Sequence, residues 1–286
     1  MDSNPRTLTE EIKHYLLQEG GRIGMSVVRL RLGTTTSPEH RVFIEVDGCK
    51  SGWLMVRLTR ETKWKVQVFQ DISSLWNQCR DASLILIDIP IGLRDSGFSE
   101  RQCDRTARKL LGRPRSSSVF RVPCRDAVYA DATKASNINK RLTGRGLSKQ
   151  VLGIIPKIRE VDKLLAVDNN ARSVMREIHP ELCFWALNGR APMKYHKKDE
   201  RGLVERRQVL RGICSFIDDL IGCALEENRG KVAEDDIIDA LAAAVTASKS
   251  VYGLSFIPDS PEIDSTGLPM QMAYCVLPTL PHFPKS

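Results

Sequence analysis

Long hydrophobic runs are absent from this sequence of 286 residues. Its longest apolar stretches, such as residues 84–87 and 240–245, are far shorter than the roughly 20 apolar residues that a membrane-spanning helix requires. No apolar stretch follows the amino terminus in the way that a secretory signal requires. We therefore expect an intracellular, cytoplasmic protein that has no membrane partner.

Paired cysteines and internal repeats are absent as well. The eight cysteines are scattered along the chain and form no C-x-x-C pair, which argues against a zinc site. We expect them to be reduced residues of the core rather than a disulfide framework. Hydrophobic residues make up 42% and charged residues 27% of the sequence, which is typical of a globular protein.

Charges of the two signs are not balanced, because 43 Lys and Arg residues face 35 Asp and Glu residues, a net charge of +8. A positive surface is compatible with a polyanionic partner, since Lys and Arg gain affinity by releasing phosphate counterions. A positive surface that only keeps the protein soluble is an equally good interpretation of the charge alone.

The stretch RVFIEVDGCKSGW at residues 41–53 places an apolar run directly before Asp47 and a turn that contains glycine. A run of this kind predicts a buried strand that presents its last carboxylate at the edge of a sheet. Taken alone, an Asp-Gly pair is more typical of a hairpin turn whose carboxylate bonds only to nearby backbone. A chemical role for Asp47 therefore depends on other acids in the sequence.

The order of elements after residue 41 indicates an α/β fold with a mixed five-stranded sheet flanked by helices. The pattern predicts three strands in hairpin order, a short helix and a fully buried strand, at residues 42–46, 53–58, 64–69, 71–80 and 84–89. The fourth strand then returns parallel to the first. In that arrangement Asp47 and Asp88 lie at the carboxyl ends of neighbouring parallel strands.

The rest of the chain predicts mostly helices. They are expected at residues 100–111, 147–167 with an interruption near Pro156, 194–226 and 234–248, with strands at 174–179 and 272–277 and a loop at 113–125. We expect one domain over residues 41–286, with helical insertions and a proline-rich C-terminal segment. Residues 1–40 are expected to form an N-terminal extension.

The late helix EDDIIDALAAAV carries acids on one face. Asp236 and Asp239 are three residues apart, and Asp235 and Asp239 are four apart, so either pair shares a helical face. The positive helix amino terminus explains Asp235 and Asp236. It does not explain Asp239, because an unpaired carboxylate one turn into a buried helix is costly. A divalent cation that is also bound by Asp47 and Asp88 removes that cost.

Such an oxygen-only ligand set suits Mg²⁺ or Mn²⁺ better than zinc. In phosphodiester cleavage, paired metal ions about 4 Å apart activate a water molecule and stabilise the leaving oxygen. The acids of this sequence therefore fit a metal-dependent hydrolase.

Six motifs, in this order along the chain, resemble one known family: VDGCKSGW, IDIPIGL, CDRTARKLLGRPRSSSVFRVPCR, QVLGIIPKIREVD, EIHPELCFWALNGR and DDIIDALAAA. The family is called domain of unknown function 429 and is described as predicted ribonuclease H-like nucleases. The strand order and the late acidic helix likewise resemble the ribonuclease H-like superfamily. The resemblance implies a ribonuclease H-like fold and a metal-dependent nuclease. It also implies that Asp47, Asp88, Asp236 and Asp239 are catalytic metal ligands. In relatives the fourth-strand acid is often Glu, which is one methylene longer than Asp88.

Glu177 and His179 share one face of the strand predicted at residues 174–179, because side chains alternate along a strand. We consider Glu177 as a further catalytic ligand. His179 is a candidate for proton transfer or for a phosphate contact. A histidine directly before Pro180 is also typical of a purely structural residue.

Basic and hydroxyl side chains between residues 105 and 125 are candidates for substrate binding. They are Arg105, Arg108, Arg113, Arg115, Ser117, Arg121 and Arg125. Arginine forks and serine hydroxyls suit phosphate contacts. A second basic group at residues 194–207 adds Lys197, although a solvated helix face explains that group equally well. The expected partner is nucleic acid, either DNA or RNA.

Three functions remain open on the sequence alone. The first is the metal-dependent nuclease. The second is a nucleotide-binding phosphotransferase of the actin and sugar-kinase type, whose first strand also ends in an Asp-Gly hairpin but which carries two copies of the fold. The third is a nucleic-acid-binding protein that retains the fold without catalysis.

Overall fold

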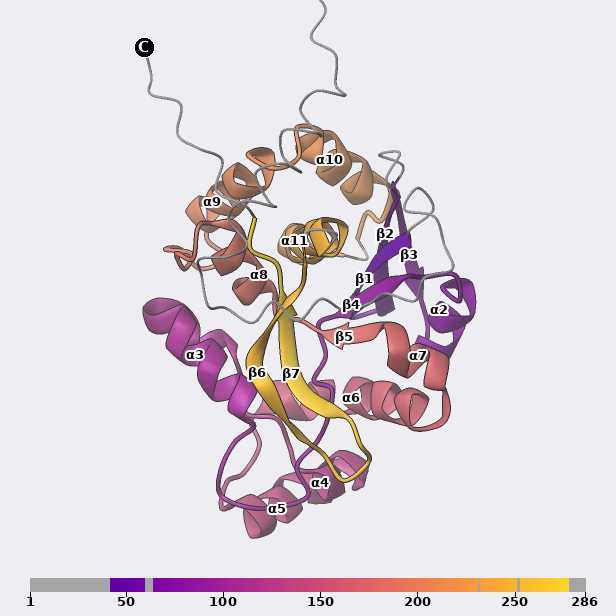
Figure 1. The fold of residues 1–286 in the computed structure, drawn as a ribbon, viewed down its shortest axis with the longest axis vertical. Coiled ribbons are helices and arrows are strands. Elements are labelled where there is room, and N and C mark those ends of the chain that lie inside the picture. Colours follow the sequence, from indigo (N-terminus) through magenta and orange to yellow (C-terminus); the bar gives the residue numbers. More distant parts are fainter. Residues whose placement is uncertain (1–41, 60–63, 231, 251–252, 278–286) are drawn as a thin grey trace, which may run out of the picture.

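A mixed five-stranded sheet with β1 at its centre organises the molecule (Figure 1). The computed structural model describes residues 42–59, 64–230, 232–250 and 253–277, so the extension predicted at residues 1–40 lies outside the described residues. The sheet has the order β3-β2-β1-β4-β5. Its strands are β1 (Val42–Cys49), β2 (Gly52–Thr59), β3 (Trp64–Phe69), β4 (Leu84–Ile87) and β5 (Met175–Glu177). β1 pairs with β2 antiparallel and with β4 parallel, which confirms the predicted mixed sheet.

Ten α-helices and a separate two-stranded sheet complete the described part of the chain. The helices are α2 (Ile72–Gln78), α3 (Gln102–Arg115), α4 (Arg125–Tyr129), α5 (Ala132–Thr143), α6 (Lys149–Val167), α7 (Asn169–Val174), α8 (Pro180–Leu187), α9 (Glu200–Arg211), α10 (Ile217–Glu227) and α11 (Glu234–Lys249). The second sheet pairs β6 (Ser255–Ile263) with β7 (Pro269–Tyr274). In the described residues, no helix has both the length and the apolar character needed to span a membrane.

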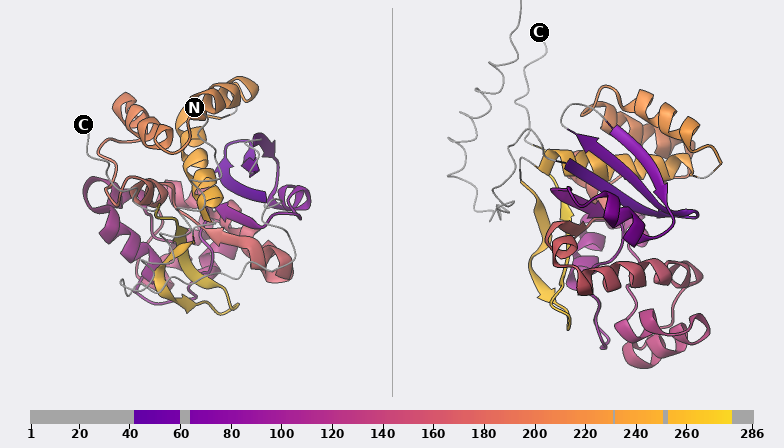
Figure 2. Two further views of the ribbon diagram at one scale, coloured as in Figure 1. Left: turned by 45° about the horizontal axis from the view of Figure 1, so that its top comes forward. Right: turned by 90° about the vertical axis from the view of Figure 1, so that its right-hand side faces the viewer.

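The alternation of side chains along β1 separates the two faces of the sheet. Val42, Ile44 and Val46 belong to a core cluster that contains residues of α2, α6 and α7. Phe43 belongs to a second cluster, which contains most of α11. The two layers of helices lie on opposite sides of the sheet (Figure 2). By this alternation Asp47 is directed toward the α11 side.

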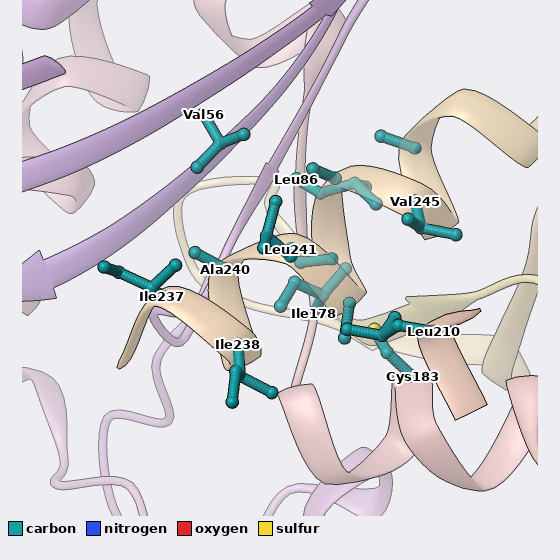
Figure 3. Packing of buried hydrophobic residues seen from close by; sticks show 14 of the residues in the cluster. Val56, Leu86, Ile178, Cys183, Leu210, Ile237, Ile238, Ala240, Leu241 and Val245 are labelled. Carbon is teal, nitrogen blue, oxygen red and sulfur yellow. The ribbon is translucent and has the colours of Figure 1, made fainter. Parts of the chain in front are cut away.

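The helix α11 lies between the sheet and the helices α8, α9 and α10 (Figure 1). Its middle is rich in alanine, and these residues are fully buried. Small side chains let the helix approach the strands closely, while Ile237 and Leu241 fill the space against Val56 and Leu86 (Figure 3). The apolar sequence of α11 thus fixes its first turn beside the carboxyl end of β1.

On the opposite face, Glu160 holds α6 to the sheet. Its carboxylate accepts a hydrogen bond from the indole nitrogen of Trp53 at 2.8 Å and another from the backbone nitrogen of Ile72 at 3.0 Å. The α6 helix runs unbroken through Pro156, so the predicted interruption there is wrong. Because Ile155 and Ile158 on either side are buried, packing outweighs the hydrogen bond that proline removes.

Two further predictions of local structure are wrong. The helix expected at residues 194–226 is two helices, α9 and α10, that are separated at residues 212–216. Arg211 and Asp218 form an ion pair across this break. The loop expected at residues 113–125 begins as the end of α3 and continues as a short 3₁₀ helix, Ser116–Ser118. Five further elements were not predicted from the sequence: α4, α5, α7, α8 and β6.

Two glycines at the β1–β2 hairpin have different roles, and only Gly52 is required by the backbone. Gly52 has a φ of +128°, and a Cβ atom there would lie 2.0 Å from the carbonyl oxygen of Phe69. Gly48 has no such backbone, but a Cβ there would lie 2.4 Å from the Cδ of Lys157. Lys157 crosses the hairpin with its ammonium 4.5 Å from the ring centre of Trp53. Gly48 therefore leaves room for the Lys157 side chain.

Candidate functional site

Asp47 and Asp88 lie side by side at the carboxyl end of the sheet, as predicted. Val46 is in register with Ile87 of the parallel strand β4, and the next residues are the two aspartates. The backbone nitrogen of Asp88 donates to the carbonyl oxygen of Val46 at 3.0 Å, which continues the pairing by one step. Both side chains are half-buried.

The first two turns of α11 bring three more acids to the same place. Asp235, Asp236 and Asp239 lie near the ammonium of Lys197, at 3.7, 3.8 and 2.8 Å respectively. Only the closest pair forms a hydrogen bond. We call the five side chains Asp47, Asp88, Asp235, Asp236 and Asp239 the carboxylate cluster.

The carboxylate cluster opens into a cavity of about 670 Å³, here called the central cleft. Basic and polar side chains line it together with the acids. They include Arg115, Ser117, Ser118, Gln150, His179, His196, Lys197 and Lys198. The cleft thus combines a negative floor with partly positive walls.

Negative charge accumulates at the floor of the central cleft. Burial raises the pKa of Asp47 well above its usual value, and Asp88 and Asp239 raise it further. Burial and then Asp239 raise the pKa of Asp88 to about 7, although Lys197 lowers it. Glu45, two residues before Asp47 on the same face of β1, also has a raised pKa, because it is buried and faces the same acids. Ionising these carboxylates together is therefore costly unless positive charge lies nearby.

Among the described residues, few groups donate a hydrogen bond or offer a positive charge to these carboxylates. Neither Asp47 nor Asp88 accepts a hydrogen bond from a described side chain, and one carboxylate oxygen of buried Glu45 has no partner. Lys197 is the only described cation in ion-pair contact with the carboxylate cluster. The donor set is made of oxygen atoms, the ligand type that Mg²⁺ and Mn²⁺ prefer, although no three of these carboxylates bring oxygen atoms within 4.8 Å of one another in this structure.

A second group of potential metal ligands lies nearby. Cys103, Asp104 and Glu177 are buried, and their ligand atoms lie within 4.8 Å of one another, so they could hold a metal ion. The guanidinium of Arg101 already bonds both acids, at 2.6 Å to Asp104 and 2.7 Å to Glu177. Because this arginine supplies the positive charge, we regard the group as a buried ion-pair network.

The comparison with protein families gives one match. The model described as "Protein of unknown function (DUF429)" matches residues 46–263, a span that contains the whole carboxylate cluster. The chain belongs to this family. Neither the curated proteins nor the solved structures contain a match to the chain.

Glu177 of this DUF429 protein lines the central cleft, but its carboxylate bonds to residues outside the carboxylate cluster. It is in register with Ile87, whose side chain packs on the α6 side of the sheet. Its carboxylate accepts hydrogen bonds from Arg101 and, at 2.7 Å, from the backbone nitrogen of Ile91. Burial raises the pKa of Glu177 to about 7, while Arg101 opposes that shift.

His179 also lines the central cleft of the DUF429 protein, as the N-cap of α8. Its Nδ1 accepts a hydrogen bond from the backbone nitrogen of Glu181 at 3.2 Å. The other ring nitrogen therefore carries the proton and faces the carbonyl oxygen of Ser118 at 3.4 Å. Burial lowers the pKa of His179, so the ring is neutral at pH 7.

The basic residues predicted to bind substrate divide into two sets. Arg115, Ser117 and Lys197 line the central cleft. The others do not: Arg105, Arg108, Arg113, Arg121 and Arg125. Both Arg108 and Arg121 form ion pairs with Glu100.

Arg125 likewise forms ion pairs within the protein instead of lining the central cleft. It bonds Asp162 and Asp264, each at 2.6 Å, and so ties the β6–β7 hairpin to α6. Arg105 and Arg113 are exposed on α3. A contact of these five arginines with substrate stays a prediction, and the geometry of the central cleft does not support it.

Several residues of the DUF429 site were missed by the sequence analysis. The position of Glu45 could have been predicted, because it is two residues from Asp47 on one strand and must share its face. Arg101 and Asp104, three residues apart at the start of α3, line the cleft together. His196 reaches the cleft through the tertiary fold, and no local pattern marks it.

Proposed function

We propose that this protein is a divalent-metal-dependent nuclease that hydrolyses phosphodiester bonds of nucleic acid. The observation that carries the proposal is the convergence of acids from three separate elements into one cleft. Asp47 comes from β1, Asp88 from the end of β4, and Asp239 from α11. A protein that only needed soluble surface charge has no reason to bury like charges together.

Asp47, Asp88, Asp236 and Asp239 are the residues that would hold the cation, Mg²⁺ or Mn²⁺. When bound, such a cation supplies activation of a water nucleophile and stabilisation of charge on the phosphate. The protein's own contribution is to fix the carboxylates on the sheet and on the buried helix α11, which leaves them little freedom to reorganise.

Arg115 is the best placed group for the phosphate. It is buried in the wall of the central cleft, and its closest acid, Glu181, lies 4.0 Å away. Its Nε has no hydrogen-bond partner among the described residues. An arginine fork with free donors suits a phosphate oxygen. Ser117 and Lys198 can add weaker contacts from the same walls.

The fold agrees with the ribonuclease H-like placement, which we propose as the superfamily. The sheet order β3-β2-β1-β4-β5 and the acidic helix α11 beside β1 are the features that support it. The phosphotransferase alternative needs two copies of such a sheet, and the described residues contain one, with a separate hairpin. The non-catalytic alternative predicts nucleic-acid binding that persists without metal.

The test is a cleavage assay with end-labelled DNA, RNA, hybrid and branched substrates in Mg²⁺, in Mn²⁺ and with a chelator. We expect cleavage of at least one substrate class that requires the divalent ion. Binding without cleavage under every metal condition would instead favour the non-catalytic alternative. Cleavage that the chelator leaves unchanged would contradict the metal-dependent mechanism.

A further inference from the structure

A second cavity, of about 220 Å³, lies beside the central cleft and has a different character. We call it the side pocket. It contains two aromatic rings, Phe98 and Phe120, and four arginines, Arg94, Arg101, Arg121 and Arg145. Four residues line both cavities: Arg101, Asp104, Phe120 and Val122. The two cavities are therefore neighbours that share a wall.

Phe98 is exposed but held in place. Its side chain is 83% exposed, which is unusual for a phenylalanine beside a cavity. The ring rests on Gly144, where an added Cβ would lie 2.7 Å from the phenyl Cε1. The backbone nitrogen of Gly97 also donates to the carbonyl oxygen of Leu142 at 3.0 Å, which ties this loop to the end of α5. An exposed aromatic ring on a tethered loop is a ready platform for stacking.

The side pocket is lined by four arginines and by two acids, Glu100 and Asp104, and the arginines are unevenly compensated. Arg94 is paired with Glu262 at 3.0 Å, but its buried Nε has no partner among the described residues. Arg121 is paired with Glu100. Arg145 is exposed, and no described acid pairs with it. Aromatic rings interleaved with arginines are the combination that binds single-stranded nucleic acid.

The volume of the side pocket limits what can enter it. An engineered protein cavity of about 150 Å³ holds one benzene ring, whereas sites for drug-sized ligands begin near 300 Å³. The side pocket therefore suits a single flat ring system. A base that is paired and stacked inside a duplex cannot enter, because it presents only its edge to the protein.

We propose that the side pocket receives one unpaired nucleobase of a strand whose phosphates lie in the central cleft, with Phe98 as its stacking platform. This inference rests on the proposed nuclease function, and it deepens it by naming single-stranded or locally unpaired nucleic acid as the substrate class. The shared wall at Arg101 and Phe120 places a base and its neighbouring phosphate in adjoining cavities.

The test measures binding rather than cleavage. Dye-labelled single strands of DNA and of RNA, and duplexes of the same sequence, are titrated with protein in Ca²⁺, and fluorescence anisotropy gives the dissociation constants. We expect Phe98→Ala to weaken single-strand binding about tenfold, since stacking on an aromatic ring contributes that much per base. Duplex binding should not change, and Phe98→Trp should bind single strands at least as tightly as the unmodified protein.

The matched control is Val167→Ala, because Val167 is also 83% exposed but lies outside both cavities. It should leave all binding unchanged. Single-strand binding that does not change in Phe98→Ala would overturn the inference, and so would equal loss in Phe98→Ala and Val167→Ala. Circular dichroism melts confirm that each variant is folded.

The outcomes separate this inference from the proposed function. Single-strand binding that depends on Phe98, without cleavage in Mg²⁺ or Mn²⁺, supports the side pocket and contradicts the nuclease. Metal-dependent cleavage, together with single-strand binding that is unchanged in Phe98→Ala, supports the nuclease function and overturns the proposal that a base binds in the side pocket.

Discussion

Replacing Asp47 with asparagine is expected to lower metal-dependent cleavage by about 10³-fold or more, as loss of a central catalytic group does in other hydrolases. Asp47 has Asp88 on the adjacent strand and Asp239 on the helix that covers β1 as acidic neighbours. Asparagine keeps the shape but loses the charge that a divalent cation requires. The measurement is the initial rate of cleavage at saturating metal.

The same substitution should not unfold the protein. Burial and the neighbouring acids raise the pKa of Asp47, so the ionised carboxylate costs free energy in the metal-free protein. We expect Asp47→Asn to leave the metal-free protein as stable as before or more so. The control is Asp131→Asn, an exposed acid at the start of α5, which should change neither property. Cleavage at the normal rate by a folded Asp47→Asn variant would remove Asp47 from the mechanism.

Replacing Arg101 with methionine is expected to lower the free energy of unfolding by about 3–5 kcal/mol, because the change leaves two buried carboxylates without a positively charged partner. The side chains of Arg101, Asp104 and Glu177 are at most 2% exposed. Arg101 also donates to the carbonyl oxygen of Ile91 at 3.1 Å and so supports the loop after β4. Urea denaturation of the metal-free protein measures the loss.

The matched control for Arg101 is Arg57→Met. Arg57 also forms a two-pronged ion pair, with Asp81 at 3.1 and 2.6 Å, but this pair is exposed. Solvent screens it, so its loss should cost less than about 1 kcal/mol. Adding Glu177→Gln to Arg101→Met should restore part of the stability, because one uncompensated charge is removed. An equal, small loss in both single variants would show that the buried network is not a structural element.

Periodicity was enough to predict the central part of the fold. An apolar run bounded by glycine indicated β1, short turns and alternation indicated β2 and β3, and the continuous apolar run before Asp88 indicated a buried parallel strand. The neighbouring positions of Asp47 and Asp88 follow from those patterns alone. Elements that depend on packing were missed: α8 has almost no polar face, and β6 contains two prolines that obscure a strand pattern.

The candidate site was predictable where local pattern decides position, and not where tertiary partners do. Asp239 is recognisable because its helix is too apolar to be exposed. Arg108 and Arg125 have the same local character as Arg115, since all three lie in one basic stretch. Arg108 and Arg125 differ from Arg115 because they form ion pairs with acids on other elements. Arg108 pairs with Glu100, and Arg125 pairs with Asp162 and Asp264. A single sequence carries no information about those pairs.

The central claim is that the carboxylate cluster binds a divalent cation, and crystals grown with Mn²⁺ test it most directly. Anomalous scattering locates manganese without assumptions about activity. We predict an anomalous peak in direct contact with the carboxylates of Asp47, Asp88 and Asp239 or Asp236, which is lost in Asp47→Asn. A peak only at Cys103, Asp104 and Glu177, or no peak in the central cleft at saturating Mn²⁺, would contradict the account.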